Sequence, residues 1–173
     1  KQIKSDFPMD HFSCEWTGKV MIEEGGKYTF FTRSDDGSRL WINGKQLVDN
    51  WGLHGARLRK GIVDLNRGWH DFKAVHFENA GGANMIVTYK GPDTKNRRKT
   101  LQGSHEKSDE TDDFAEALET QKPNGFIAKF WYFKKETNGK GYETENVKPN
   151  LIKTMDKINF PNEGRFRKLS KNF

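Results

Sequence analysis

The sequence predicts an all-β fold, an antiparallel β-sandwich or barrel of short strands. Three observations predict it: 13% of the 173 residues are aromatic, 17 are glycine, and several segments alternate polar and apolar residues. Aromatic residues are enriched in strands, and glycine supplies the turns between them. Since no helical period runs through the first 90 residues, these strands pair with one another and leave no room for crossover helices.

Seven segments of the first 90 residues have strand character, and turn residues separate them. They are residues 19–24, 27–33, 39–42, 46–49, 61–65, 69–77 and 85–89. Asn43-Gly44 is the strongest hairpin signal among the turns, because both residues tolerate a positive φ. Short strands at this spacing are typical of an antiparallel sandwich or barrel.

The rest of the chain differs in composition. Residues 93–123 predict a charged linker, basic up to Lys99 and then acidic, with seven carboxylates between residues 106 and 119. Phe114, Ala117 and Leu118 have helical spacing there, which favours a short amphipathic helix over residues 112–120. Strand-like composition returns in residues 124–173, but this part is too small to form a core of its own.

Composition excludes several classes of function. The formal net charge is +6, but the basic residues are scattered, so we do not expect a nucleic-acid interface. Cys14 is the single cysteine, which excludes an internal disulfide framework. No apolar stretch approaches the roughly 20 residues of a membrane-spanning helix. No nucleophile motif, phosphate loop or histidine cluster indicates an enzyme.

Several motifs together resemble the PA14 domain family. They are Phe12 to Gly18, Gly26 to Phe30, Ser34 to Gly44, Val48 to Trp51, Gly68 to His70 and Glu78 to Ala83. The resemblance implies a β-sandwich module of the kind found in toxins, glycosidases and adhesins, several of which bind sugars. It covers residues 1–92 as a domain that lacks its opening strand, and residues 124–173 resemble the opening part of a second such domain.

A missing opening strand would leave an unpaired edge in the first domain's sheet. Two segments are candidates to fill it: residues 126–133 folding back, as in a permuted domain, or a segment upstream of this chain. We favour the upstream segment, because the length and charge of the linker indicate separation. We therefore interpret the chain as a fragment that contains parts of two tandem PA14-like domains.

The resemblance also implies a calcium site. In the sugar-binding members, two adjacent aspartates joined by a cis peptide and an asparagine on a second loop hold calcium, which binds vicinal sugar hydroxyls. Asp35, Asp36 and Asn79 match these metal ligands, and we expect Trp51, His54, Gly81 and Gly82 to line the sugar pocket. Calcium prefers six to eight oxygen ligands, which such residues supply. The alternative is a structural turn, in which the aspartates bond their own backbone.

The sequence therefore predicts a non-catalytic binding module for calcium-assisted carbohydrate recognition. Its expected partner is a glycan or glycoprotein, and its expected location is extracellular or at the cell surface. The competing hypothesis is a structural protein–protein interaction module in a larger assembly, intracellular or ciliary, that binds no sugar.

Overall fold

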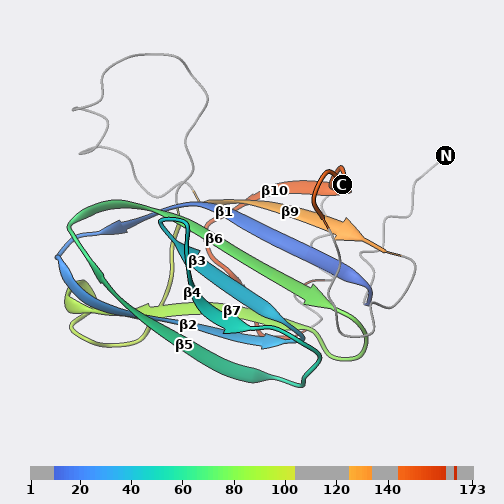
Figure 1. The fold of residues 1–173 in the computed structure, drawn as a ribbon, viewed down its shortest axis with the longest axis horizontal. Coiled ribbons are helices and arrows are strands. Elements are labelled where there is room, and N and C mark those ends of the chain that lie inside the picture. Colours follow the sequence, from blue (N-terminus) through green and yellow to red (C-terminus); the bar gives the residue numbers. More distant parts are fainter. Residues whose placement is uncertain (1–9, 104–124, 134–143, 163–165, 167–173) are drawn as a thin grey trace, which may run out of the picture.

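The computed structural model describes residues 10–103, 125–133, 144–162 and 166, which form two stacked antiparallel sheets (Figure 1). The first sheet contains, in spatial order, β10 (Leu151–Met155), β9 (Phe126–Tyr132), β1 (Phe12–Ile22), β6 (Gly68–Glu78), β3 (Ser38–Ile42) and β4 (Lys45–Asn50). The second contains β11 (Asn159–Phe160), β7 (Asn84–Lys90), β2 (Gly26–Asp35) and β5 (Arg57–Leu65), with β8 (Lys99–Thr100) also paired to β7. The predicted all-β sandwich is confirmed.

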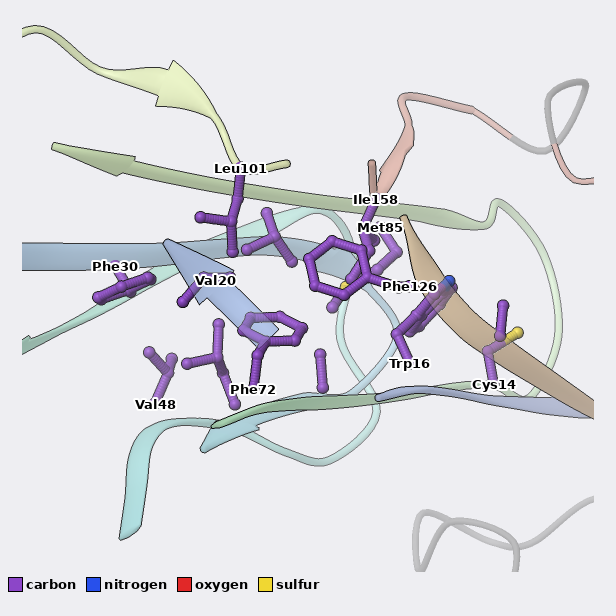
Figure 2. Packing of buried hydrophobic residues seen from close by; sticks show 14 of the residues in the cluster. Cys14, Trp16, Val20, Phe30, Val48, Phe72, Met85, Leu101, Phe126 and Ile158 are labelled. Atoms are coloured by element: carbon purple, nitrogen blue, oxygen red, sulfur yellow. The ribbon is translucent and has the colours of Figure 1, made fainter. Parts of the chain in front are cut away.

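The core lies between the two sheets and is rich in aromatic side chains (Figure 2). Trp16, Phe30, Phe72 and Phe126 are almost completely buried there, together with Met85 from the second sheet. On β6 the even-numbered residues from Phe72 to Glu78 face inward and are buried. Burial of this much aromatic surface is the main stabilising contribution to the fold.

The described part of residues 124–173 completes the first domain. This corrects the prediction that these residues begin a second copy of the domain. Strand β9 pairs antiparallel with β1, from Phe12 opposite Tyr132 to Thr17 opposite Ile127. The inward positions of β9 are Phe126, Ala128 and Phe130, and each is fully buried. The preference for an upstream strand was wrong, because β9 occupies that edge and satisfies the backbone groups of β1.

The segment reaches the second sheet as well. Strand β10 continues the first sheet beyond β9, and β11 then pairs with β7, with Asn159 opposite Ile86. Ile158 and Phe160 enter the same core as the strands of the first 92 residues. In the described part of residues 124–173, the chain therefore belongs to one domain with β1–β7.

The predicted linker is also corrected in its first part. Pro92–Thr94 form a turn of 3-10 helix, β8 follows, and Leu101 is buried in the core. The Gly125 amide donates to the Gly103 carbonyl at 2.7 Å, so these two residues lie side by side. The remainder of the linker and the predicted helix over residues 112–120 lie outside the described residues. Among the residues described, a helix with the length and apolarity to cross a membrane is not found.

Candidate functional site

The site is built on the turn that follows β2. The peptide bond between Asp35 and Asp36 is cis. The Asp36 carboxylate is buried and accepts two backbone hydrogen bonds, from the His54 N–H to Oδ1 at 2.9 Å and from the Asn79 N–H to Oδ2 at 3.0 Å. Asp36 thereby joins the loop between β4 and β5 to the loop between β6 and β7. The structure brings Asp35, Asp36, Asn79 and His54 together.

Asp35 is the half-buried member of the pair. Burial, and then the neighbouring Asp36 carboxylate, raise the pKa of Asp35. The register of β2 and β7 places Asp35 opposite Asn84 and so beside the glycine loop. A Cβ at Gly82 would lie 3.7 Å from Asp35 Oδ2, so this loop passes close to the carboxylate. Gly81 has a φ of +102° and no atom within 4 Å of the Cβ position, so it faces open space.

Glu78 is a third carboxyl group of the site, and the sequence interpretation missed it. Its side chain is fully buried, and Oε2 accepts a hydrogen bond from the Asp36 N–H at 3.1 Å. The other oxygen, Oε1, is buried and has no hydrogen-bond partner among the described residues. Burial, followed by the charges of Asp36 and Asp35, raises the pKa of Glu78 to about 9. The alternation of residues along β6 could have identified it, because Glu78 lies two residues after His76 and therefore on the same inward face.

Trp51 and His54 lie in the loop that follows β4. The Trp51 ring packs against Phe77 at 4.7 Å between centroids, and the Arg39 guanidinium lies over it at 4.4 Å. The ring nitrogens of His54 lie 2.9 Å from the carbonyls of Gly55 and Asn50. The His54 ring therefore fixes its own loop, and Arg39 is a further neighbour of the site that sequence reasoning missed.

The oxygen atoms around this turn are of the kind that calcium binds. The carboxyl groups of Asp35, Asp36 and Glu78 lie near one another in a partly desolvated place, where Glu78 keeps its proton at neutral pH in the absence of an ion. Glu78 Oε1 has no hydrogen-bond partner among the described residues. Among the described residues, no group of three or more acidic, histidine or cysteine side chains is placed to hold a metal alone. A calcium ion would therefore also need the Asn79 amide, backbone carbonyls, water or ligand hydroxyls, which are oxygen donors that calcium accepts.

The raised pKa of Glu78 predicts how stability depends on pH. A carboxyl with a pKa near 9 in the folded state and 4.5 otherwise keeps its proton on folding, so stability falls as pH rises between these values. Burial lowers the pKa of His76 to about 3, which reduces stability only as pH falls below 6.5. Between pH 7 and 9, without calcium, the unfolding free energy should therefore decrease.

Urea unfolding at pH 7, 8 and 9 measures this slope. Glu78→Gln keeps an acceptor for the Asp36 N–H and should be markedly flatter than the parent over this range. An equal slope in both proteins would show that Glu78 does not titrate there.

A family model described as the PA14 domain matches residues 1–103. The anti-sigma-I factor RsgI3 of Acetivibrio thermocellus is 36% identical over 81 residues, which are 46% of this chain and 13% of that protein. An anti-sigma factor domain-containing protein from Clostridium clariflavum has a TM-score of 0.50 at 20% identity, covering 83% of this chain and 44% of that one. A PA14 sugar-binding domain from an RTX adhesin has a TM-score of 0.48 at 23% identity, covering 56% of each chain. The region matched by this chain is thus less than half the length of the A. thermocellus and C. clariflavum proteins.

Proposed function

This chain belongs to the PA14 domain family, and on that premise we propose that it is a binding module for calcium-assisted carbohydrate recognition. Asp35, Asp36 and Asn79 would hold the calcium ion, with Glu78 as an additional oxygen donor. When bound, calcium supplies open coordination positions that vicinal sugar hydroxyls fill. The family supports a binding module in general, and the sugar and the ion are our proposal.

The observation that carries the proposal is the convergence of two loops on one carboxylate. Asp36 accepts backbone hydrogen bonds from both His54 and Asn79, so the loop of Trp51 and the loop of Gly82 meet beside Asp35. This arrangement is preorganised, because the backbone bonds hold the carboxylates before any ligand arrives. The two oxygens of Asp36 retain further lone pairs, so holding the loops together does not prevent Asp36 from binding an ion.

The proposed sugar pocket lies between these loops. Gly81 and Gly82 would form one wall, and the backbone around His54 the other. Trp51 would offer its ring to a pyranose, but Arg39 covers the ring and would have to move aside. We therefore expect Arg39 to compete with the sugar for the ring, or to donate hydrogen bonds to its hydroxyls. We place the domain outside the cell or at its surface.

A glycan array probed with and without a calcium chelator tests the proposed function. We expect binding to a restricted set of glycans in the presence of calcium and loss of this binding with chelator. The matched control is Asp64→Asn, which removes an exposed carboxylate on β5, outside the site, and should bind as the parent does. Glycan binding that persists in chelator would contradict the calcium requirement, and binding to no glycan would contradict the proposal as a whole.

A protein partner is the second candidate. The observation that favours it is the similarity to the A. thermocellus anti-sigma-I factor, of which the matched region is 13%. On this proposal the domain contacts a neighbouring protein and Asp36 serves only to hold the loops. The same array, blank under both conditions while a protein partner binds to the domain, would favour this candidate.

A further inference from the structure

A polar cavity lies at the end of the sandwich opposite the acidic turn. It has a volume of about 350 Å³ and is lined by Met21, Glu23, Tyr89, Asp93, Lys99, Thr100, Leu101 and Gln102. Glu23 lies just before β2, whereas Asp35 is the last residue of β2, so the cavity and the acidic turn lie at opposite ends of that strand. The two places share no residue.

Asp93 is the unusual residue of this cavity. Both of its carboxylate oxygens are buried, and neither has a hydrogen-bond partner among the described residues. The Tyr28 hydroxyl is a close polar neighbour of Asp93: it accepts from the Asp93 N–H at 3.4 Å and donates to the Glu24 carbonyl at 2.6 Å, and while it donates there its single proton is not available to the carboxylate. Lys99 also lines the cavity but donates no hydrogen bond to Asp93. A buried, unsatisfied carboxylate is costly, so a missing partner is expected.

The turn that carries Asp93 is held firmly. The Gly91 amide donates to the Thr94 hydroxyl at 2.9 Å, and the Lys95 amide donates to the Pro92 carbonyl at 2.8 Å. A Cβ at Gly91 would lie 2.2 Å from the Tyr28 ring, so the turn packs directly against that ring. The backbone that carries Asp93 is therefore held in place beside the cavity.

The surroundings of Asp93 favour a cation. Glu23, Tyr89 and Asp93 line the cavity together, and burial, then the charges of Asp93 and Glu23, raise the pKa of Tyr89 to about 12. The lining contains two acidic side chains, Glu23 and Asp93, and one basic side chain, Lys99, so its formal charge is negative. Tyr89, Thr100 and Gln102 add neutral oxygen acceptors.

We propose that this cavity binds a primary ammonium group on a small polar molecule, with Asp93 as its ion-pair partner. A primary ammonium has three donors, which match the two free oxygens of Asp93 and one of the neighbouring acceptors. Calcium fits less well, because it requires six to eight oxygens and the lining has only two carboxylates beside a lysine. Met21 and Leu101 provide an apolar wall for the carbon skeleton of the ligand.

Amide NMR titration of the protein with n-butylammonium chloride, at constant ionic strength against sodium chloride, tests the proposal. We expect saturable shifts of the amides around Asp93 and Thr100. Asp93→Asn should weaken binding at least tenfold, whereas Asp64→Asn should bind as the parent does. If Asp93→Asn fails to fold, Glu23→Gln replaces it, with an expected weakening of severalfold.

Three results would overturn the proposal. The first is a non-saturable response, which would mean that water alone satisfies the carboxylate. The second is saturable shifts of the same amides with calcium chloride but not with butylammonium. The third is unchanged butylammonium affinity in a folded Asp93→Asn protein. None of these results bears on glycan binding at the acidic turn, so the two proposals fail independently.

Discussion

Replacing Phe126 with alanine should lower the unfolding free energy of the whole domain by about 3–5 kcal/mol. The Phe126 ring is fully buried and packs on Phe72 of β6, with 4.7 Å between the centroids. Its loss would leave a cavity between the sheets, because residues from both sheets surround it and cannot all collapse inward. The effect tests directly whether the C-terminal segment is part of the first domain.

Guanidinium unfolding followed by tryptophan fluorescence measures this loss. Ile152→Ala is the matched control, because that side chain lies on the adjacent strand β10 and is 58% exposed. It should change stability by less than about 0.5 kcal/mol. We expect one cooperative transition that shifts to lower denaturant in Phe126→Ala. If the main transition stays where it is and only a minor one moves, the segment is not part of the cooperative unit.

Replacing Asp36 with alanine, in calcium-free buffer, should cost about 2–3 kcal/mol. The change removes the carboxylate acceptor of the part-buried His54 N–H and of the buried Asn79 N–H. Part of the loss is offset, because Glu78 and Asp35 are relieved of a neighbouring negative charge. The loops on both sides of the turn should loosen together.

Asp35→Ala is the informative comparison. Asp35 is half-buried, and its pKa is raised because its ionised form is disfavoured in the folded protein, so its removal should cost well under 1 kcal/mol. Thermal unfolding of both variants in chelator measures the difference. Equal losses would show that the two carboxylates have the same structural role, which would favour the simple turn over a binding site.

The strands were predictable because their signals are local. The period-two alternation and the Asn43-Gly44 turn indicated the hairpin of β3 and β4, which the structure pairs as expected. Most predicted strands differ from the observed ones by only a few residues at their ends. The exceptions are β1, which begins at Phe12, and β5, which begins at Arg57, because neither start is marked by a turn residue.

The pairing of β9 was not predictable in the same way. Its sequence, with inward Phe126, Ala128 and Phe130, is equally suited to the edge of this sheet or of another copy. Which sheet β9 joins depends on the open edge of β1 and on the hydrogen bond that brings Gly125 beside Gly103. Both are properties of the folded chain. The contact between Arg39 and Trp51 is likewise set by packing between β3 and a loop.

The candidate site was foreseen in part. The motif identified Asp35, Asp36 and Asn79, and the structure places them together. Glu78 was missed because a glutamate at the end of a strand is usually exposed, and only the inward phase of β6 makes it a buried carboxyl.

A calorimetric calcium titration of the parent and of Asp35→Asn is the most direct measurement. Asp35→Asn retains the size of the side chain and should leave the backbone bonds of Asp36 intact, so a loss of affinity would report on the ion. For the parent we predict one site with a dissociation constant on the order of 10⁻⁴–10⁻³ M, as in extracellular modules, and at least tenfold weaker binding in the variant. No heat at millimolar calcium, or equal affinity in both proteins, would contradict a calcium site at this turn.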